Sequence, residues 1–150
     1  ALPAVLKRHP DACYLVAGTG PDEGRLRSLA GDVGGSGAVT FTGRVLEEDK
    51  LALLDLCDAY VLASREEDQR VEGLGIALLE AAARGRPLVA GRHGGVPEIV
   101  SHGENGYLVD PADPADEAAS VVELLDDPAR AGEMGAVGRR RVAERFLARF

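Results

Sequence analysis

The chain has 150 residues, of which 45% are hydrophobic and 28% charged, and its formal net charge is −8. This length suits a single domain with its own core, and the apolar content is that of a globular rather than a disordered protein. The negative charge argues against a general nucleic-acid or anionic-membrane surface, because such binding needs a broad basic field. No apolar run approaches the ~18 residues that span a bilayer, and no signal segment is visible.

Apolar segments of strand length alternate with helical patterns along the chain. Strands are expected at residues 12–17, 39–42, 59–63, 87–90 and 105–109. Helices are expected at residues 2–9, 22–32, 47–56, 76–83 and 117–125, after Pro97, and from residue 129 onward. Each strand is too short and too apolar to be half exposed, which is typical of a parallel sheet with helices on both faces. The predicted fold is therefore α/β, a Rossmann-like three-layer sandwich around a parallel sheet of about five to six strands.

The first predicted strand ends in the turn Gly18-Thr19-Gly20-Pro21. This is a fragment of a dinucleotide fingerprint that lacks the third glycine, and by itself it is more often a plain strand-to-helix turn. Ligands of an open parallel sheet sit beyond the carboxyl ends of its strands, so Gly18 and Gly20 are candidate cleft-lining residues. The two cysteines, Cys13 and Cys57, have neither disulfide-framework nor metal-site spacing and are expected to be buried thiols in a reducing cytoplasm.

The predicted helix 76–83 is apolar on every side except at Glu80, so we expect it in the interior. Glu72 lies eight positions earlier, in a glycine-flanked turn that feeds the helix. Free backbone amides at Gly73, Leu74, Gly75 and Ile76 would lie between the two carboxylates, with the positive end of the helix dipole behind them.

This arrangement suits a ligand that is anionic in the middle and rich in hydroxyls at both ends, such as a nucleotide diphosphate sugar. The helix start would hold the phosphates, and each carboxylate would accept hydrogen bonds from neighbouring hydroxyls. We assign the ribose diol to Glu80 and the sugar hydroxyls to Glu72. The alternative is structural: Arg84 stands at i+4 from Glu80, a favourable ion-pair order, and Glu72 is then a solvated turn residue.

The segments around this helix have simpler expected roles. The charged run 65–70 is expected to be a solvated face, or alternatively a rim over the sugar site. Gly94 and Gly95 would let backbone approach a ligand, His93 is a candidate proton carrier without an evident partner, and Glu98 suits a helix start. Five arginines near the C-terminus are expected on a solvated or interdomain face: Arg139, Arg140, Arg141, Arg145 and Arg149.

Three ordered segments carry a resemblance: E-G-L-G-I-A-L-L-E-A-A-A-R-G-R-P-L-V-A at 72–90, G-G-V-P-E-I-V at 94–100 and G-E-N-G-Y-L-V at 103–109. Together they resemble the donor-binding half of the retaining glycosyltransferases of family 4, which have the GT-B architecture. Glu72 and Glu80 match the E-x7-E motif of that family. The resemblance runs over nearly all residues, so 1–150 would be one C-terminal donor-binding domain whose N-terminal acceptor domain is absent.

The resemblance implies a hexosyltransferase that binds a nucleotide diphosphate sugar, of the GDP-mannose or UDP-glucose type, and retains anomeric configuration. It implies backbone contacts to the base at Gly43, Arg44 and Val45, although Arg44 is alternatively a surface arginine. Glu72 would orient the hexose as the catalytic residue, with no protein nucleophile, metal or cofactor. The arginine and lysine that neutralise the phosphates in that family are expected upstream of this chain, which alone should bind donor weakly and transfer nothing. Any peripheral membrane association would come through the absent half.

Two other classes of function remain open. A sugar-nucleotide epimerase of GT-B fold would share the diphosphate but needs catalytic acids that the sequence does not place. A non-catalytic α/β regulatory module would leave Glu72 and Glu80 structural. Neither the donor base and sugar, nor the acceptor, nor the oligomeric state follows from the sequence.

Overall fold

The computed structural model describes residues 1–65 and 75–147. Its chain divides into two compact units, Ala1–Leu53 and Leu54–Phe150. No helix in the described part of the chain is long and apolar enough to cross a membrane. Five strands occur among the described residues, all paired in parallel, so the predicted α/β class is confirmed. They form a two-stranded sheet in the first unit and a three-stranded sheet in the second.

The first unit holds a pair of parallel strands with two whole helices and most of a third. Its elements are α1 (Leu2–Arg8), β1 (Tyr14–Ala17), α2 (Glu23–Asp32) and β2 (Val39–Gly43), followed by most of α3 (Glu47–Leu56). Strand β1 runs alongside β2, with Tyr14 opposite Val39, and the register shifts between Val16 and Ala17. The four predicted elements before residue 44 thus all form, within about two residues of their expected bounds.

The expected burial of the first strand on both faces is wrong. Tyr14 is 45% exposed and Leu15 41% exposed. Within the first unit β1 has β2 as its paired neighbour, and two strands offer too few side chains to cover both faces. Cys13, just before the strand, is exposed, so its expected burial is also wrong, whereas Cys57 is half-buried.

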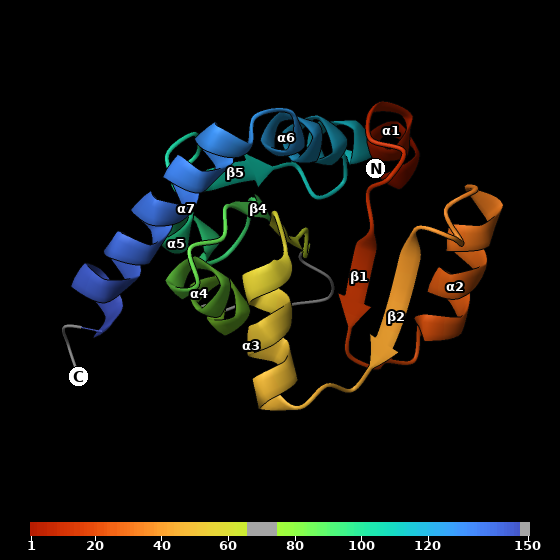
Figure 1. Cartoon of the computed structure of the whole chain (residues 1–150), viewed down its shortest axis with the longest axis horizontal. Helices are drawn as coiled ribbons and strands as arrows, with labels where there is room; N and C mark the ends of the chain where they lie inside the picture. The colour runs from red at the N-terminus through yellow and green to blue at the C-terminus, as the bar shows by residue number, and fades with distance from the viewer. Residues whose placement is uncertain (66–74, 148–150) are drawn as a thin grey trace. The chain divides into compact units, whose positions relative to one another are not determined.

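The second unit has helices on both faces of its sheet. The elements that follow α3 are β3 (Tyr60–Leu62), α4 (Ile76–Ala83), β4 (Leu88–Gly91), α5 (Val96–Ile99), β5 (Gly106–Val109), α6 (Pro114–Asp126), α7 (Pro128–Arg141) and the π-helical η1 (Val142–Leu147). The strand order is β3-β4-β5, with Val61 opposite Val89 and Val89 opposite Tyr107. Helix α6 lies on one side of β4 and β5 and α4 on the other (Figure 1).

Alternation along β4 divides the core into two layers. Leu88 and Ala90 pack with the apolar face of α4, while Val89 packs with α6 and α7. Leu88, Val89 and Ala90 are each 0% exposed, which confirms the burial expected of this strand. The three-layer arrangement predicted for the chain is therefore present in this unit.

A buried asparagine fixes the turn that enters β5. Asn105 is 1% exposed. Its Oδ1 accepts a hydrogen bond from the Ser101 amide at 2.7 Å, and its Nδ2 donates to the Ile99 carbonyl at 2.9 Å. Both polar ends of the side chain are thereby satisfied, which links the end of α5 to the strand.

Candidate functional site

The start of α4 lies at the carboxyl edge of the three-stranded sheet. Strand β3 ends at Leu62 and α4 runs back toward the beginning of β4, so its first turn is at the edge where β3 ends. Gly75 is the N-cap, and no side chain among the described residues caps the helix. The first helical amides therefore have no partner within the helix, and the binding of phosphate by Gly75 and Ile76 stays a prediction. Glu72, Gly73 and Leu74 lie outside the described residues, and their roles stay predictions.

Helix α4 is buried on one side only. Leu78, Ala81 and Ala82 are each 0% exposed, while Ile76 is 69% exposed. The expectation of an all-round interior helix is thus wrong at Ile76, because the sheet covers a single face. Glu80 is half-buried and shares the face of Ile76, four positions away. A large exposed apolar side chain and a carboxylate consequently stand on the same face, within about one helical turn of the helix start.

Arg84 does not pair with Glu80. Its Nε donates to Oδ1 of Asp55 at 2.7 Å and its Nη2 to Oδ2 of the same carboxylate. The hydrogen bond with Arg84 lowers the pKa of Asp55 and raises the pKa of Arg84 itself. The ion pair between Glu80 and Arg84, which was the structural alternative for Glu80, is therefore not formed. Arg84 pairs with Asp55 instead. Nothing in the sequence spacing singles out Asp55, which lies 29 positions away.

In the first unit the structure brings two of the predicted site glycines together. The Gly18 amide donates to the Gly43 carbonyl at 2.8 Å, where β1 and β2 end. Their φ angles are +125° and +70°, a region that disfavours other residues. A Cβ on Gly18, Gly20 or Gly43 would meet no described atom within 4 Å, so open space adjoins this backbone. The side chain of Arg44 is exposed and that of Val45 half-buried.

The loop between β4 and α5 contains a histidine whose polar atoms are enclosed. Both ring nitrogens of His93 are buried, and neither has a hydrogen-bond partner among the described residues. Glu98 lies in the first turn of α5, beside Pro97, as predicted for a carboxylate near the positive end of a helix. Its backbone carbonyl accepts a hydrogen bond from Arg145 at 3.2 Å.

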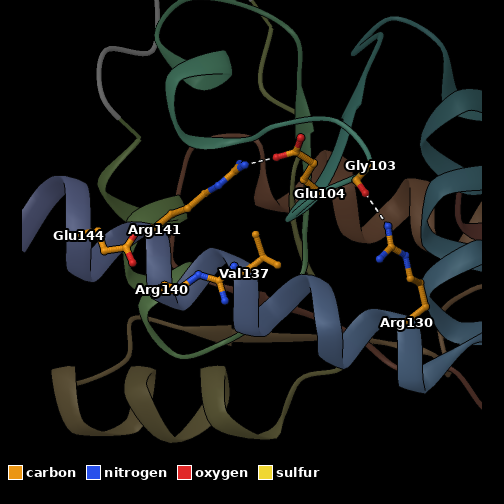
Figure 2. A pocket seen from close by; sticks show the side chains of 7 residues that line it. All are labelled: Gly103, Glu104, Arg130, Val137, Arg140, Arg141 and Glu144. Carbon is orange, nitrogen blue, oxygen red and sulfur yellow. Dashed lines mark hydrogen bonds and ion pairs between the residues drawn. The ribbon is translucent and has the colours of Figure 1, made fainter.

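A cavity of about 420 Å³ lies beside α7. Its lining residues are Gly103, Glu104, Arg130, Val137, Arg140, Arg141 and Glu144 (Figure 2). Arg141 pairs with Glu104, and Arg130 donates to the Gly103 carbonyl at 2.7 Å, so two arginines hold the turn before β5 against the helix. Arg139 and Arg140 are exposed, as predicted. Sequence spacing does not indicate this cavity, because the segments that line it, residues 103–104 and 130–144, are distant in sequence and come together only in the folded chain.

No cluster of histidine, cysteine, aspartate and glutamate suited to a metal ion occurs in the ranges 1–65 and 75–147. The burial of Cys57 raises the pKa of its thiol, and the nearby Arg86 opposes this shift. Arg86 also donates to the Cys57 carbonyl at 2.9 Å. These contacts suit a structural cysteine rather than a nucleophile.

Residues 1–141 match the model of the family described as glycosyl transferases group 1. The chain is 41% identical over 148 residues to a GDP-mannose-dependent alpha-(1-6)-phosphatidylinositol monomannoside mannosyltransferase of Mycobacterium tuberculosis, covering 97% of this chain and 38% of that protein. It is 37% identical over 146 residues to a glycogen synthase of the same organism, covering 97% of this chain and 34% of that enzyme.

A solved structure gives the same fold. The chain resembles the C-terminal domain of a glycosyl transferase group 1 family protein from Francisella tularensis with a TM-score of 0.81 and 27% identity, over 96% of this chain and 75% of that one. The chain spans only about two fifths of the length of the curated relatives that it matches. With a family model that covers most of its residues, the chain belongs to the glycosyl transferases group 1 family.

Proposed function

We propose that this chain is the donor-binding part of a retaining glycosyltransferase of family 4 with the GT-B architecture. The observation that carries the proposal is Glu80, a half-buried carboxylate about one turn after a helix start that no described side chain caps, at the carboxyl edge of a parallel sheet. Its partners would be a nucleotide diphosphate sugar and an N-terminal acceptor-binding domain. The share of the relatives' length that the chain spans, and its likeness to a C-terminal domain, support the second partner.

In the proposed complex each end of the donor meets a carboxylate. Glu80 accepts hydrogen bonds from the ribose diol, and Glu72 orients the hexose. The amides of Gly73, Leu74, Gly75 and Ile76 bind the phosphates, where the helix dipole favours negative charge. Gly18 and Gly20 line the cleft, and Gly43, Arg44 and Val45 contact the base through backbone groups.

The chemistry of the domain is electrostatic. As the sugar leaves, negative charge grows on the departing diphosphate, and preorganised amides stabilise it without reorganising. The acceptor would attack on the face from which the diphosphate leaves, which retains configuration without a protein nucleophile, metal or cofactor. The donor is of the GDP-mannose or UDP-glucose type; the name of the mannosyltransferase relative supports GDP-mannose. We place the enzyme in the cytoplasm, with any membrane contact made by the acceptor half.

Calorimetric titration of the chain with GDP, UDP, GDP-mannose and UDP-glucose tests the proposal. A charge-assisted hydrogen bond is worth ~1.5–3 kcal/mol, so Glu80→Ala should weaken binding by about tenfold or more. Glu117→Ala, which removes a carboxylate of similar burial from α6, is the matched control and should bind like the wild type. A regulatory module would bind none of the four ligands. Binding that survives Glu80→Ala unchanged would refute the assigned role, and glycosyl transfer by this chain alone would contradict the need for the acceptor domain.

A further inference from the structure

His93 follows the central strand of the three-stranded sheet. Strand β4 ends at Gly91, two residues earlier, and pairs with both β3 and β5. A Cβ at Gly91 would collide with the carbonyl oxygen of Ser64 and lie 3.2 Å from Cβ of Pro111, so the chain leaving β4 passes between the segments that leave its two neighbours. His93 therefore stands near the middle of the carboxyl edge, where an open parallel sheet receives its ligands.

The backbone of His93 is hydrogen-bonded at both of its polar groups, whereas its side chain is not. The amide donates to the Gly91 carbonyl at 3.0 Å, and the carbonyl accepts from the Val96 amide at 3.2 Å. Both ring nitrogens are enclosed, and neither has a hydrogen-bond partner within residues 1–65 and 75–147. Native proteins pair nearly all buried polar side-chain atoms, because an unpaired one has lost its hydrogen bonds to water. Two such atoms on one ring indicate a contact that the chain itself does not supply.

The loop that carries His93 and the start of α4 share one part of the core. Val96, three residues after His93, and Leu78, in the first turn of α4, lie in the same buried apolar cluster. Strands β3 and β4, which precede these two segments, are paired neighbours. The His93 loop and the helix start proposed above to bind phosphate thus follow adjacent strands at one edge of the sheet.

We propose that His93 is a binding residue for the diphosphate of the donor, to which a ring nitrogen donates a hydrogen bond. The ionised oxygens of a diphosphate accept hydrogen bonds, and an imidazole ring has at least one N–H in either protonation state. Because the nitrogens are enclosed in the ligand-free chain, the ring must turn about its side-chain torsions to reach the ligand. The turn replaces unpaired nitrogens by a hydrogen bond to an anion, which is stronger than one between neutral groups. This inference rests on the proposed function, since it names a further group of the same donor site.

The substitution His93→Leu separates ligand binding from folding. Leucine has a similar volume and removes both nitrogens, so it should replace a side chain without partners at no loss of stability. In urea unfolding without ligand, the midpoint of His93→Leu should equal or exceed that of the wild type. In calorimetric titration, GDP and UDP should bind about tenfold more weakly, because each loses one hydrogen bond to a charged acceptor.

His102→Leu is the matched control in the same unit. Nδ1 of His102 accepts a hydrogen bond from the Leu108 amide at 3.1 Å, and the residue precedes β5, at the opposite edge of the sheet. This variant should unfold at a lower urea concentration and bind both nucleotides like the wild type. A second variant of the binding residue, His93→Gln, retains an N–H donor and should recover part of the binding that His93→Leu loses.

The other outcomes overturn the inference in distinguishable ways. Lower stability of ligand-free His93→Leu would show that the nitrogens have partners in the folded chain. Unchanged binding of GDP and UDP by this variant would remove the role of His93, and the proposed function would still stand if Glu80→Ala weakens binding. A loss confined to GDP-mannose and UDP-glucose would place His93 on the hexose instead of the diphosphate. If the wild-type chain binds neither GDP nor UDP, the proposed function fails and the role of His93 fails with it.

Discussion

Gly135 lies where α7 passes the end of α4, and its replacement by alanine should destabilise the protein. A Cβ at this position would lie 2.7 Å from the carbonyl carbon of Gly85 and closer still to its oxygen. Gly85 itself has a φ of +72°, so the backbone that would have to move is already in a conformation that few residues tolerate. Overpacking of this kind costs ~1–3 kcal/mol, more than the ~1 kcal/mol that alanine gains over glycine in a helix.

The same helix provides the control. A Cβ at Gly132 would meet no described atom within 4 Å, so Gly132→Ala should gain up to ~1 kcal/mol from helix propensity alone. Urea unfolding followed by circular dichroism measures both variants. The expected result is a lower midpoint for Gly135→Ala and an equal or higher one for Gly132→Ala. Equal stability of the two variants would contradict the close approach of α7 to the backbone of Gly85.

Two further predictions concern polar groups of the second unit. Asn105→Ala should lower the free energy of unfolding by ~2–4 kcal/mol in urea titrations, because it removes the partners of the part-buried Ser101 amide and the buried Ile99 carbonyl. A loss below ~1 kcal/mol would contradict these hydrogen bonds. The contribution of Asp55 to stability should depend on pH, because its folded pKa lies below the usual 3.8. It should be present at neutral pH and lost as pH falls through the folded value, so Asp55→Ala and wild type should converge in acid. A difference that persists in acid would exclude the ion pair as its source.

Most elements could be predicted from local patterns. Helix α3 begins and ends where expected, and β3, β4 and β5 form within about two residues of their expected bounds. The reason is that an apolar run bounded by glycine or proline specifies strand or helix through its own backbone preferences. That the chain is a glycosyltransferase was also predicted from contiguous stretches of residues, and the match to the glycosyl transferases group 1 family confirms it.

Only part of the candidate site could be predicted from local sequence patterns. The position of Gly75 at the helix start agrees with the prediction, and Gly18 follows β1 as expected, whereas Gly43 is the last residue of β2. The partner of Arg84 was missed, because the nearest opposite charge in sequence, Glu80, is not the one it contacts. The cavity beside α7 was missed for a similar reason, since Arg141 and Glu104 are 37 positions apart.

The order of strands and helices, their approximate bounds and the family were determined by the sequence itself, because each depends on residues that are neighbours along the chain. Which strands share a sheet, which apolar side chains are buried and which carboxylate binds Arg84 were decided by the tertiary structure alone. Burial and ion pairing are properties of the surroundings of a side chain, and in the second unit those surroundings come from segments such as α3 and α4 that are distant in sequence. For this reason Asp55, which no motif marks, is identified as the partner of Arg84 only in the folded chain.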